Sequence, residues 1–451
     1  MRLTILGGGG FRVPLVYRAL AGSEVDTLTL YDTDPLRAGV MRSVLDGLPR
    51  PADGGGLPRV VVAESLDEAV RGADFVFSAI RVGGTAGRVA DEHIPLSEGL
   101  LGQETVGAGG VLYGLRTVPV ALRIAERIAE LAPDAWAINF TNPAGTVTEA
   151  MASVLGSRVI GICDSPVGLV RRAARAAGAD PDTVGYDYVG LNHLGWLRSL
   201  TAPDGRDLLP GLLADEAALG AFEEGRLFGP TWLRALGALP NEYLHYYYFR
   251  RETLAAVRAA EQTRGAFLDG QQSTFFAEAH RQPERAFALW ERTRLEREET
   301  YMAESRAASG GWERDTCDLD GGGYDQVALA LMRALARDRP ARLILNVRNS
   351  SGGPGAPLVL PALPADAVVE TVCEVDGSGV RPVVSPEPLG PAELGLVLQL
   401  KAVERATIEA ALFKDREAAL RAVALHPLVD SVAAAERVLA RAGGVTPAHG
   451  R

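Results

Sequence analysis

Three short segments of this 451-residue chain carry the side chains best suited to chemistry. They cover residues 139–143, 161–166 and 190–196, and each follows directly on a short apolar run. Side chains that leave the carboxyl ends of strands in an open parallel sheet line its ligand crevice. We therefore expect one Cys, one Asp, one His and three Asn from these segments to converge on a single pocket.

Cys163 and His193 are the candidate metal ligands in these segments. Their separation along the chain does not match the Cys-x-x-Cys pairs of structural zinc sites, and a buried Cys on its own is usually a small apolar residue. A pair of protein ligands, however, leaves coordination positions open, which suits a catalytic ion that also binds substrate hydroxyls. Spacing alone leaves both interpretations open.

Two further side chains could move protons. Asp164 adjoins Cys163 and could act as a general acid, or it could cap a helix that begins near Pro166. Tyr243 lies in an aromatic run, where packing is the usual role. A tyrosine can nevertheless act as a base where a metal or a cation lowers its pKa.

The N-terminus has the order of a dinucleotide-binding motif. An apolar strand at residues 3–6, a glycine turn and a helix from about Pro14 are predicted in succession. In this order the backbone comes close to a pyrophosphate, and the start of the helix supplies N–H groups. The motif is imperfect, because Arg12 stands at the third glycine position counted from Gly7 and Gly9. A glycine turn without a cofactor is therefore the alternative.

Strands alternate with helices in the part of the chain that must position these side chains. Strands are predicted at 28–31, 60–63 and 74–80, which indicates a doubly wound parallel sheet. The first of them ends at Asp32, about where an acid would bind an adenosine ribose and favour NAD over NADP. The segment 83–114, rich in glycine and polar residues, is expected to be a long functional loop.

Composition narrows the class of protein. Hydrophobic content of 47% and charged content of 23% fit a soluble globular enzyme, and the length suggests two domains. The net charge of −11 argues against a nucleic-acid partner. Three widely spaced Cys, at 163, 317 and 373, suit a reducing cytosol, and no apolar run approaches the ~18 residues that span a membrane. We expect a cytoplasmic protein with no membrane partner.

The chain resembles the NAD- and divalent-metal-dependent glycosidases of glycoside hydrolase family 4, and most closely their 6-phospho-β-glucosidase branch. Matching segments occur in order along nearly the whole chain, at residues 5–14, 102–105, 139–145, 161–166, 190–194, 243–248, 407–410 and 426–428. The resemblance implies an α/β fold with an N-terminal Rossmann-type parallel sheet (1–185). It also implies a lactate/malate-dehydrogenase-like α+β C-terminal domain (186–451) for substrate, metal and oligomer contacts.

The resemblance also implies an unusual mechanism, an exception to the two-carboxylate chemistry of most glycoside hydrolases. Bound NAD would oxidise the C3 hydroxyl of the sugar, which acidifies the hydrogen on C2. Tyr243 would abstract that proton, and Mn(II) or another divalent metal held by Cys163 and His193 would stabilise the enediolate. Elimination at C1, addition of water and return of the hydride would follow, so that NAD is regenerated at each turnover.

The remaining site residues follow from the glycine motif and the resemblance together. NAD is expected to contact Gly7, Gly9, Gly10, Phe11, Arg12, Asp32, Arg81 and Asn139. The sugar is expected to contact Arg88, Asn142, Asn192 and Arg264, with the amides orienting hydroxyls and the arginines holding a phosphate. A homodimer or homotetramer is the implied assembly.

Two positions depart from the pattern of the 6-phospho-β-glucosidases. Asp164 stands where many of them have Asn, and an Asp there is the proposed acid of the α-specific enzymes. Phe11 and Arg12 follow the glycines, where phospho-sugar members usually have Ser or Thr. These departures leave open whether the substrate is phosphorylated and which anomer is cleaved.

Three other functions are considered. The first is an α-specific glycosidase of the same family. The second is a lactate/malate-type NAD-dependent dehydrogenase, which would use a His base and need no metal. The third is a cofactor-bound sensor without catalysis.

Overall fold

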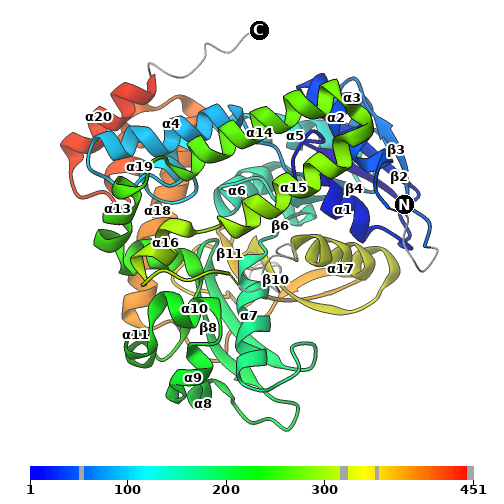
Figure 1. Cartoon of the computed structure of the whole chain (residues 1–451). Helices are drawn as coiled ribbons and strands as arrows, with labels where there is room; N and C mark the ends of the chain where they lie inside the picture. Colours follow the sequence, from blue (N-terminus) through cyan, green and yellow to red (C-terminus); the bar gives the residue numbers. More distant parts are fainter. Residues whose placement is uncertain (50–54, 315–322, 351–354, 444–451) are drawn as a thin grey trace.

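The computed structural model describes residues 1–49, 55–314, 323–350 and 355–443 (Figure 1). Across these residues one 12-stranded sheet runs in the order β3-β2-β1-β4-β5-β6-β10-β11-β7-β8-β9, with β12 paired to β11. The predicted α/β fold, with a Rossmann-type parallel sheet followed by an α+β part, is confirmed. Cys317 lies outside the described residues.

The parallel part of the sheet contains the six N-terminal strands. They are β1 (Arg2–Leu6), β2 (Thr27–Tyr31), β3 (Arg59–Val62), β4 (Phe75–Ser78), β5 (Trp136–Asn139) and β6 (Val159–Gly161). The register pairs Leu6 with both Tyr31 and Ser78, so the carboxyl ends of β1, β2 and β4 are level. The loops that follow these strands therefore meet at one edge.

Helices cover this part of the sheet. They are α1 (Val13–Ala19), α2 (Pro35–Asp46), α3 (Leu66–Val70), α4 (Gly84–Ser97), α5 (Gly107–Leu131), α6 (Ala144–Leu155), the 3-10 turn η1 (Gly156–Arg158) and α7 (Ser165–Ala176). Pro14 lies in the first turn of α1, as predicted. Asp34 begins α2 because its carboxylate accepts hydrogen bonds from the N–H groups of Leu36 and Arg37.

Most of the segment 83–114 is helical, which corrects the prediction of a long loop. It contains α4 and the first turns of α5. A Cβ atom at Gly109 would lie 2.2 Å from the carbonyl oxygen of Gln103 and 2.6 Å from that of Asp91. Glycine at this position serves close packing between backbones, a role that outweighs its low helix propensity.

The rest of the sheet is antiparallel. Its strands are β7 (Gly185–Leu191), β8 (Leu194–Thr201), β9 (Leu239–Pro240), β10 (Ala341–Arg348), β11 (Val368–Asp376) and β12 (Gly379–Pro382). β10 pairs with β6 through Asn346 and Gly161, so the sheet continues from one part into the other. The division at 185/186 into domains stays a prediction.

The third chemistry-bearing segment is a hairpin turn, not the end of a parallel strand as predicted. β7 and β8 pair antiparallel up to Leu191 and Leu194, so Asn192 and His193 form the turn. His193 has a φ of 62°, a left-handed conformation that is uncommon for residues other than glycine. The turn still brings both side chains to the cleft because it follows the carboxyl end of β7.

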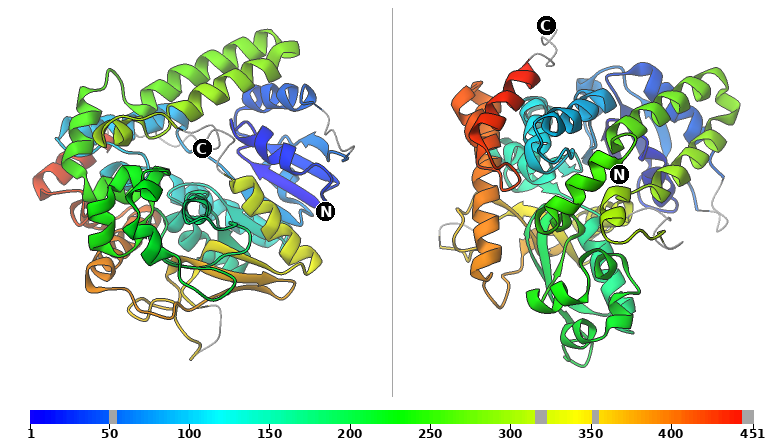
Figure 2. Two further views of the ribbon diagram at one scale, coloured as in Figure 1. Left: turned by 60° about the horizontal axis from the view of Figure 1, so that its bottom comes forward. Right: turned by 60° about the vertical axis from the view of Figure 1, so that its left-hand side comes forward.

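The remaining helices surround the sheet and form its outer layer (Figure 2). They are α8 (Leu209–Ala214), α9 (Glu216–Leu219), α10 (Glu223–Phe228), α11 (Pro230–Leu236), η2 (Glu242–Leu244), α12 (His245–Tyr248), α13 (Arg250–Ala259), α14 (Arg264–Arg281), η3 (Pro283–Arg285), α15 (Ala286–Glu299), α16 (Ala303–Ala308), α17 (Tyr324–Arg337), α18 (Pro391–Phe413), α19 (Arg416–Ala424) and α20 (Val432–Gly443). The pair α14–α15 packs on α2 and α4, while α18 and α19 pack on α5.

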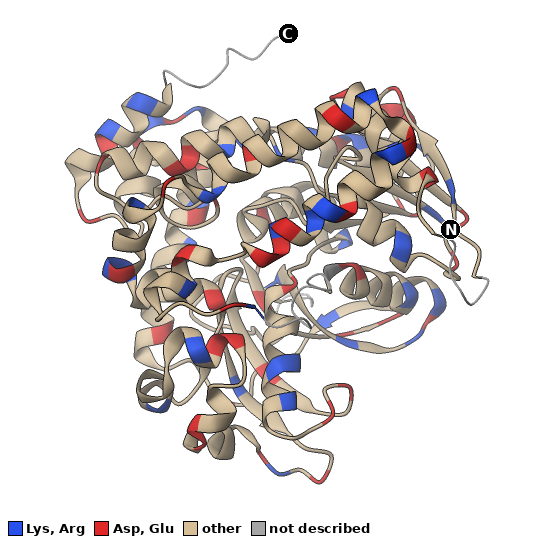
Figure 3. Cartoon of the chain, viewed as in Figure 1, with Lys and Arg blue, Asp and Glu red and all other residues tan. Residues whose placement is uncertain are grey.

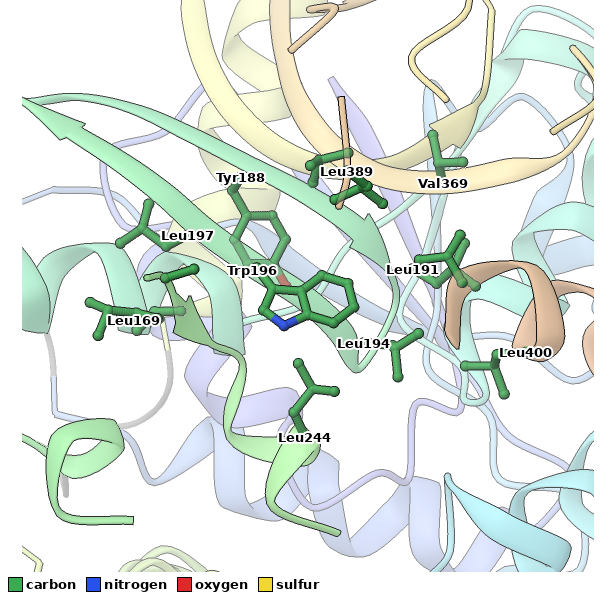
Figure 4. Close-up of a cluster of buried hydrophobic side chains, with 14 of the residues drawn as sticks. Leu169, Tyr188, Leu191, Leu194, Trp196, Leu197, Leu244, Val369, Leu389 and Leu400 are labelled. Atoms are coloured by element: carbon green, nitrogen blue, oxygen red, sulfur yellow. The ribbon is translucent and has the colours of Figure 1, made fainter. Parts of the chain in front are cut away.

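The β7–β8 hairpin is anchored by the largest apolar core (Figure 4). Trp196 and Tyr188 are 0% exposed, and Leu244 packs against them. The indole Nε1 of Trp196 donates a hydrogen bond of 3.1 Å to the hydroxyl of Tyr248. This core fixes the position of the turn that carries His193.

Charged side chains of both signs are spread over the helices, as along α15 in Figure 3. In the part of the chain that the structure describes, no helix is both long enough and apolar enough to cross a membrane.

Candidate active site

One cavity of about 930 Å³ joins the edge of the parallel sheet to the β7–β8 turn and to α14–α15. It brings together most of the residues predicted for the site. Those that line it are Gly7, Gly10, Phe11, Arg12, Asp32, Arg81, Arg88, Asn142, Cys163, Asp164, Asn192, His193, Tyr243 and Arg264. The side chains come from both predicted domains, so neither domain alone contains the site.

The glycine loop after β1 has the shape that a pyrophosphate needs. Gly7 has a φ of 82°, and a Cβ atom there would lie 2.5 Å from the carbonyl oxygen of Ala79. Gly9 does not line the cavity; its N–H donates to Asp32 Oδ2 at 2.9 Å. This bond holds Asp32 at the end of β2, where it faces the cavity. The residues present therefore fit a dinucleotide with an adenosine ribose beside Asp32.

Asn139 is not placed to bind a cofactor through its side chain. It is 0% exposed and does not line the cavity. Its amide nitrogen donates to the carbonyl oxygens of Thr141 and Ala144 and to the hydroxyl of Thr148, at 3.0–3.3 Å. Asn139 therefore orders the loop after β5, which presents Asn142 to the cavity.

His193 is held in the form that a metal ligand needs. The hydroxyl of Thr105 donates to Gln103 Oε1 at 3.0 Å, so toward His193 Nδ1, 3.1 Å away, it acts as acceptor. Nδ1 then carries the proton, and the lone pair of Nε2 is left for an ion. Burial lowers the pKa of His193 to about 3, which keeps the ring neutral at physiological pH.

Cys163 also lines the cavity, at the carboxyl end of β6. Burial, followed by the charge of Glu370, raises the pKa of its thiol well above the usual value, and a bound metal would reverse that effect. Among the described residues, no group of three or more His, Cys, Asp or Glu side chains could hold a metal. Cys163 and His193 therefore fit an ion that takes its other ligands from a substrate.

Tyr243 lies directly against the candidate metal ligand. Its ring stacks on that of His193 with centroids 3.6 Å apart and an interplanar angle of 2°. Its N–H donates to Asn241 Oδ1 at 3.0 Å, and its hydroxyl lies 3.4 Å from that of Tyr301. Burial, then the charge of Glu242, raises the pKa of Tyr243.

Asp164 occupies the N-cap position of α7, but its side chain makes no capping hydrogen bond. Instead, Oδ2 is 3.1 Å from a guanidinium nitrogen of Arg12, and both side chains line the cavity. The pair joins the glycine loop to the residue beside Cys163. Arg12, which stands where phospho-sugar members usually have Ser or Thr, therefore contacts Asp164 as well as forming part of the cofactor loop.

Phe11 and Arg81 are predicted cofactor contacts that also hold the walls of the cavity. The ring of Phe11 is 5% exposed and meets Phe275 edge-on, with centroids 5.4 Å apart. Arg81 pairs with Glu104 at 2.6 Å, and Glu104 also pairs with Arg88 at 2.9 Å. Although burial acts in the opposite direction, these two arginines lower the pKa of Glu104 to about 2.

Arg88 and Arg264 line the cavity together with a third arginine, Arg297. Arg264 donates to the hydroxyl of Thr300 and, at 2.7 Å, to the carbonyl oxygen of Arg297. Burial, followed by the charge of Arg88, lowers the pKa of Arg264 to about 10. Arg88, Arg264 and Arg297 line this end of the cavity, where Glu298 and Glu304 also lie, and arginine suits bidentate contacts to an anion.

Sequence reasoning missed three residues of the site: Arg297, Tyr301 and Glu242. The first two belong to a stretch of alternating acids and bases that is typical of solvent-exposed helices, and nothing in its spacing marks them. Glu242 adjoins Tyr243, which is the one signal that could have found it.

Asn192 is the last predicted residue at the cavity. Its amide nitrogen donates to Glu370 Oε1 at 3.1 Å, and Glu370 also accepts from Asn346 and Tyr188. Burial raises the pKa of Glu370 to about 7. This buried group fixes the side chain that precedes His193.

The fold and the cavity together define a Rossmann-type α/β enzyme. The chain belongs to family 4 of the glycosyl hydrolases, because the model of that family matches residues 3–179 and the model of its C-terminal domain matches residues 188–429. It is 31% identical to a 6-phospho-beta-glucosidase of Escherichia coli, over 98% of this chain and 94% of that protein. It is 27% identical to a 6-phospho-alpha-glucosidase of Leptotrichia buccalis, over 97% and 96%.

A solved structure supports the same assignment. The 6-phospho-beta glucosidase from Thermotoga maritima, with manganese, NAD+ and glucose-6-phosphate, superposes with a TM-score of 0.79 at 25% identity. The match covers 99% of this chain and 98% of that chain.

Proposed function

We propose that this protein is a 6-phospho-β-glucosidase that works with NAD and a divalent metal, Mn(II) by preference. The observation that carries the proposal is the stacking of Tyr243 on His193 at 3.6 Å, inside the cavity that the glycine loop also lines. When bound, NAD would accept a hydride from C3 of the sugar, and the metal would stabilise negative charge on its neighbouring oxygens.

The residues of the chain have separate tasks in this proposal. Tyr243 takes the proton from C2, and Cys163 and His193 hold the ion. Asn142 and Asn192 orient the sugar hydroxyls. Support comes from the presence of all five residues in the lining of one cavity.

A 6-phosphate would lie among Arg88, Arg264 and Arg297. Arg88 is held by Glu92 at 2.8 Å and by Glu104, whereas the guanidinium of Arg297 makes no hydrogen bond or ion pair in the described part of the chain. Its guanidinium lies over the ring of Phe11, 5.7 Å from the ring centroid. A phosphate would supply the acceptor that Arg297 lacks.

The α-anomer is the second candidate substrate. Asp164 favours it, because a carboxyl group at this place could protonate the leaving oxygen of an α-glucoside, and relatives of both specificities match the chain. The motif that begins at Tyr243 favours the β-anomer. The carboxylate of Asp164 is already paired with Arg12, at 3.1 Å.

The test uses p-nitrophenyl β-glucoside and its 6-phosphate with NAD and Mn(II), and both α-anomers as controls. We expect p-nitrophenol from the β-6-phosphate with no net NADH. Release from the α-6-phosphate alone would establish the second candidate. Faster turnover of the unphosphorylated glucosides than of their 6-phosphates would show that the arginines do not bind a substrate phosphate. NADH that accumulates without p-nitrophenol would identify a dehydrogenase, while ligand binding without any turnover would identify a sensor.

The assembly is proposed to be a homodimer or homotetramer. Phe413 and Leu412, at the end of α18, are 75% and 46% exposed, which is unusual for such large apolar side chains. Light scattering coupled to gel filtration gives the mass directly, and a monomer at assay concentration would contradict the proposal.

A further inference from the structure

A chain of hydroxyl groups leads from Tyr243 away from the cavity to a buried carboxylate. The Tyr301 hydroxyl donates to Glu242 Oε1 at 2.7 Å, so toward Tyr243, 3.4 Å away, its oxygen acts as acceptor. Tyr243 and Tyr301 line the cavity, whereas Glu242 does not and is 4% exposed. The 3.4 Å contact is longer than a usual O–H···O bond, and such contacts commonly shorten once substrate is bound.

Glu242 lies in a region with more acids than bases. Oε1 also accepts from the hydroxyl of Ser165 at 3.0 Å, and Oε2 lies 3.7 Å from Arg172. Arg172 is committed to Glu224, with which it forms two hydrogen bonds. The titratable and charged groups around Glu242 are Arg172 on α7, Glu223 and Glu224 on α10, Tyr243, Tyr246, Tyr301 and Arg314.

The balance of these charges favours proton uptake. Arg314 pairs with Glu223 at 3.4 Å and with Glu298 at 3.5 Å, so its charge is shared among several carboxylates. Burial, followed by repulsion from Glu223, raises the pKa of Glu242 to about 7. A carboxylate with this surplus of negative neighbours can accept a proton near neutral pH.

We propose that Glu242 is the acceptor of the proton that Tyr243 removes from C2, and that Tyr301 passes it on. The inference rests on the proposed function, in which C3 has already been oxidised by NAD. The C2–H bond breaks and its electron pair enters the C2–C3 bond, which gives the enolate. The proton goes to the oxygen of Tyr243, the Tyr243 proton goes to Tyr301, and the Tyr301 proton goes to Glu242.

Both tyrosines stay neutral in this transfer, and one negative charge moves from Glu242 to the sugar. No buried tyrosinate has to form, which removes the high cost of an isolated charge away from water. The reverse transfer returns the proton to C2 when water has added. Glu242 and Tyr301 act through Tyr243, so they are positioning residues and not catalytic ones.

The test compares Glu242→Gln and Tyr301→Phe with the wild type, each with NAD, Mn(II) and the p-nitrophenyl 6-phosphoglucoside that the wild type hydrolyses. Tyr247→Phe is the matched control. The Tyr247 hydroxyl is buried, has no hydrogen-bond partner among the described residues, and does not line the cavity. Thermal unfolding and NADH binding establish that each variant is folded.

Both relay variants are expected to lower kcat by about 10- to 100-fold with little change in KM. This loss of rate is a part of what general base catalysis commonly contributes. Glu242 is active when ionised, so wild-type kcat should rise as pH increases through about 7. That rise should disappear in both variants and remain in Tyr247→Phe. The substrate phosphate also titrates near pH 6, but its contribution is common to all four proteins. The isotope effect of deuterium at C2 should increase in the relay variants.

Wild-type kcat in both variants, or a loss of kcat with the pH rise retained, would overturn the relay. If one variant does not fold, the other decides. The proposed function fails separately, when the wild type releases no p-nitrophenol from any of the four substrates, and the relay then fails with it.

Discussion

Arg297 gives the most direct test of an anion site in the cavity. It lies on α15 and lines the cavity, and in the described part of the chain its guanidinium contacts the ring of Phe11 and donates no hydrogen bond. Burial, followed by the charge of Arg12, lowers its pKa to about 9. The guanidinium can therefore donate its hydrogen bonds to a phosphate. It contributes little to the stability of the free protein.

The substitution Arg297→Met keeps the apolar stem of the side chain and removes the charge. A hydrogen bond to a charged group contributes about 1.5–3 kcal/mol, which corresponds to a loss of about 10- to 150-fold in kcat/KM for a 6-phosphorylated substrate. The unphosphorylated glucoside should be affected far less. The free energy of unfolding without ligand should stay within about 0.5 kcal/mol of wild type or increase, because no hydrogen bond or ion pair of the guanidinium is lost.

Two assays check these magnitudes. The first is steady-state kinetics with the phosphorylated and unphosphorylated glucosides. The second is thermal unfolding with added glucose 6-phosphate, which should raise the midpoint of wild type much more than that of the variant. The control is Arg292→Met on the same helix, because Arg292 is 68% exposed and lies 3.5 Å from Glu278.

The pH dependence of glucose 6-phosphate affinity provides an independent check, because a nonspecific loss of affinity would not depend on pH in this direction. An arginine with a lowered pKa is neutral above that value, so wild-type affinity for glucose 6-phosphate should fall as pH rises through about 9. Arg297→Met should lack this decline. Equal responses of Arg297→Met and Arg292→Met to glucose 6-phosphate, or equal losses for both glucosides, would refute an anion site at Arg297.

Three further predictions concern the metal, the base and the core. EDTA should abolish turnover and Mn(II) should restore it, with Cys163 and His193 as ligands; undiminished activity after exhaustive dialysis against EDTA would argue against the metal. Tyr243→Phe should lower kcat by about 10²- to 10⁴-fold while NADH binding, followed by fluorescence, is unchanged; a variant with normal kcat would show that another group is the base. Trp196→Ala should destabilise the protein by about 3–5 kcal/mol in urea unfolding, because its indole is 0% exposed beneath the site hairpin. A cost below ~1 kcal/mol would mean that the hairpin does not depend on this core.

Local patterns in the sequence were enough to predict much of the N-terminal half. A strand, a glycine turn and a helix follow one another within about twenty residues. Each of them can be predicted from a local signal: the apolar run, the glycines and Pro14. Asp32 could be placed because the end of β2 is a local feature. Cys163 and His193 could be identified as candidate metal ligands from their residue types. The resemblance of the surrounding segments to family 4 then gave them a role.

The segment 83–114 shows where local patterns fail. Its glycines predicted a loop, yet they lie in or beside helices, and at Gly102, Gly109 and Gly110 the backbone packs too closely for a side chain. Tertiary packing overrides the low helix propensity of glycine, and that packing cannot be read from the segment itself. The same holds for the β7–β8 turn, whose place in the sheet depends on pairing with β11 from far along the chain.

By itself, the sequence determined which chemical groups are available: a Cys, a His, a Tyr and a glycine loop, in the order that family 4 shares. Only the tertiary structure decided which groups face one another. It paired Arg12 with Asp164, left Arg297 beside Arg264, and placed Tyr301 between Tyr243 and Glu242. The physical reason is that hydrogen bonds and charges act over a few ångströms in space, whatever the separation in the chain, which is 152 positions for Arg12 and Asp164.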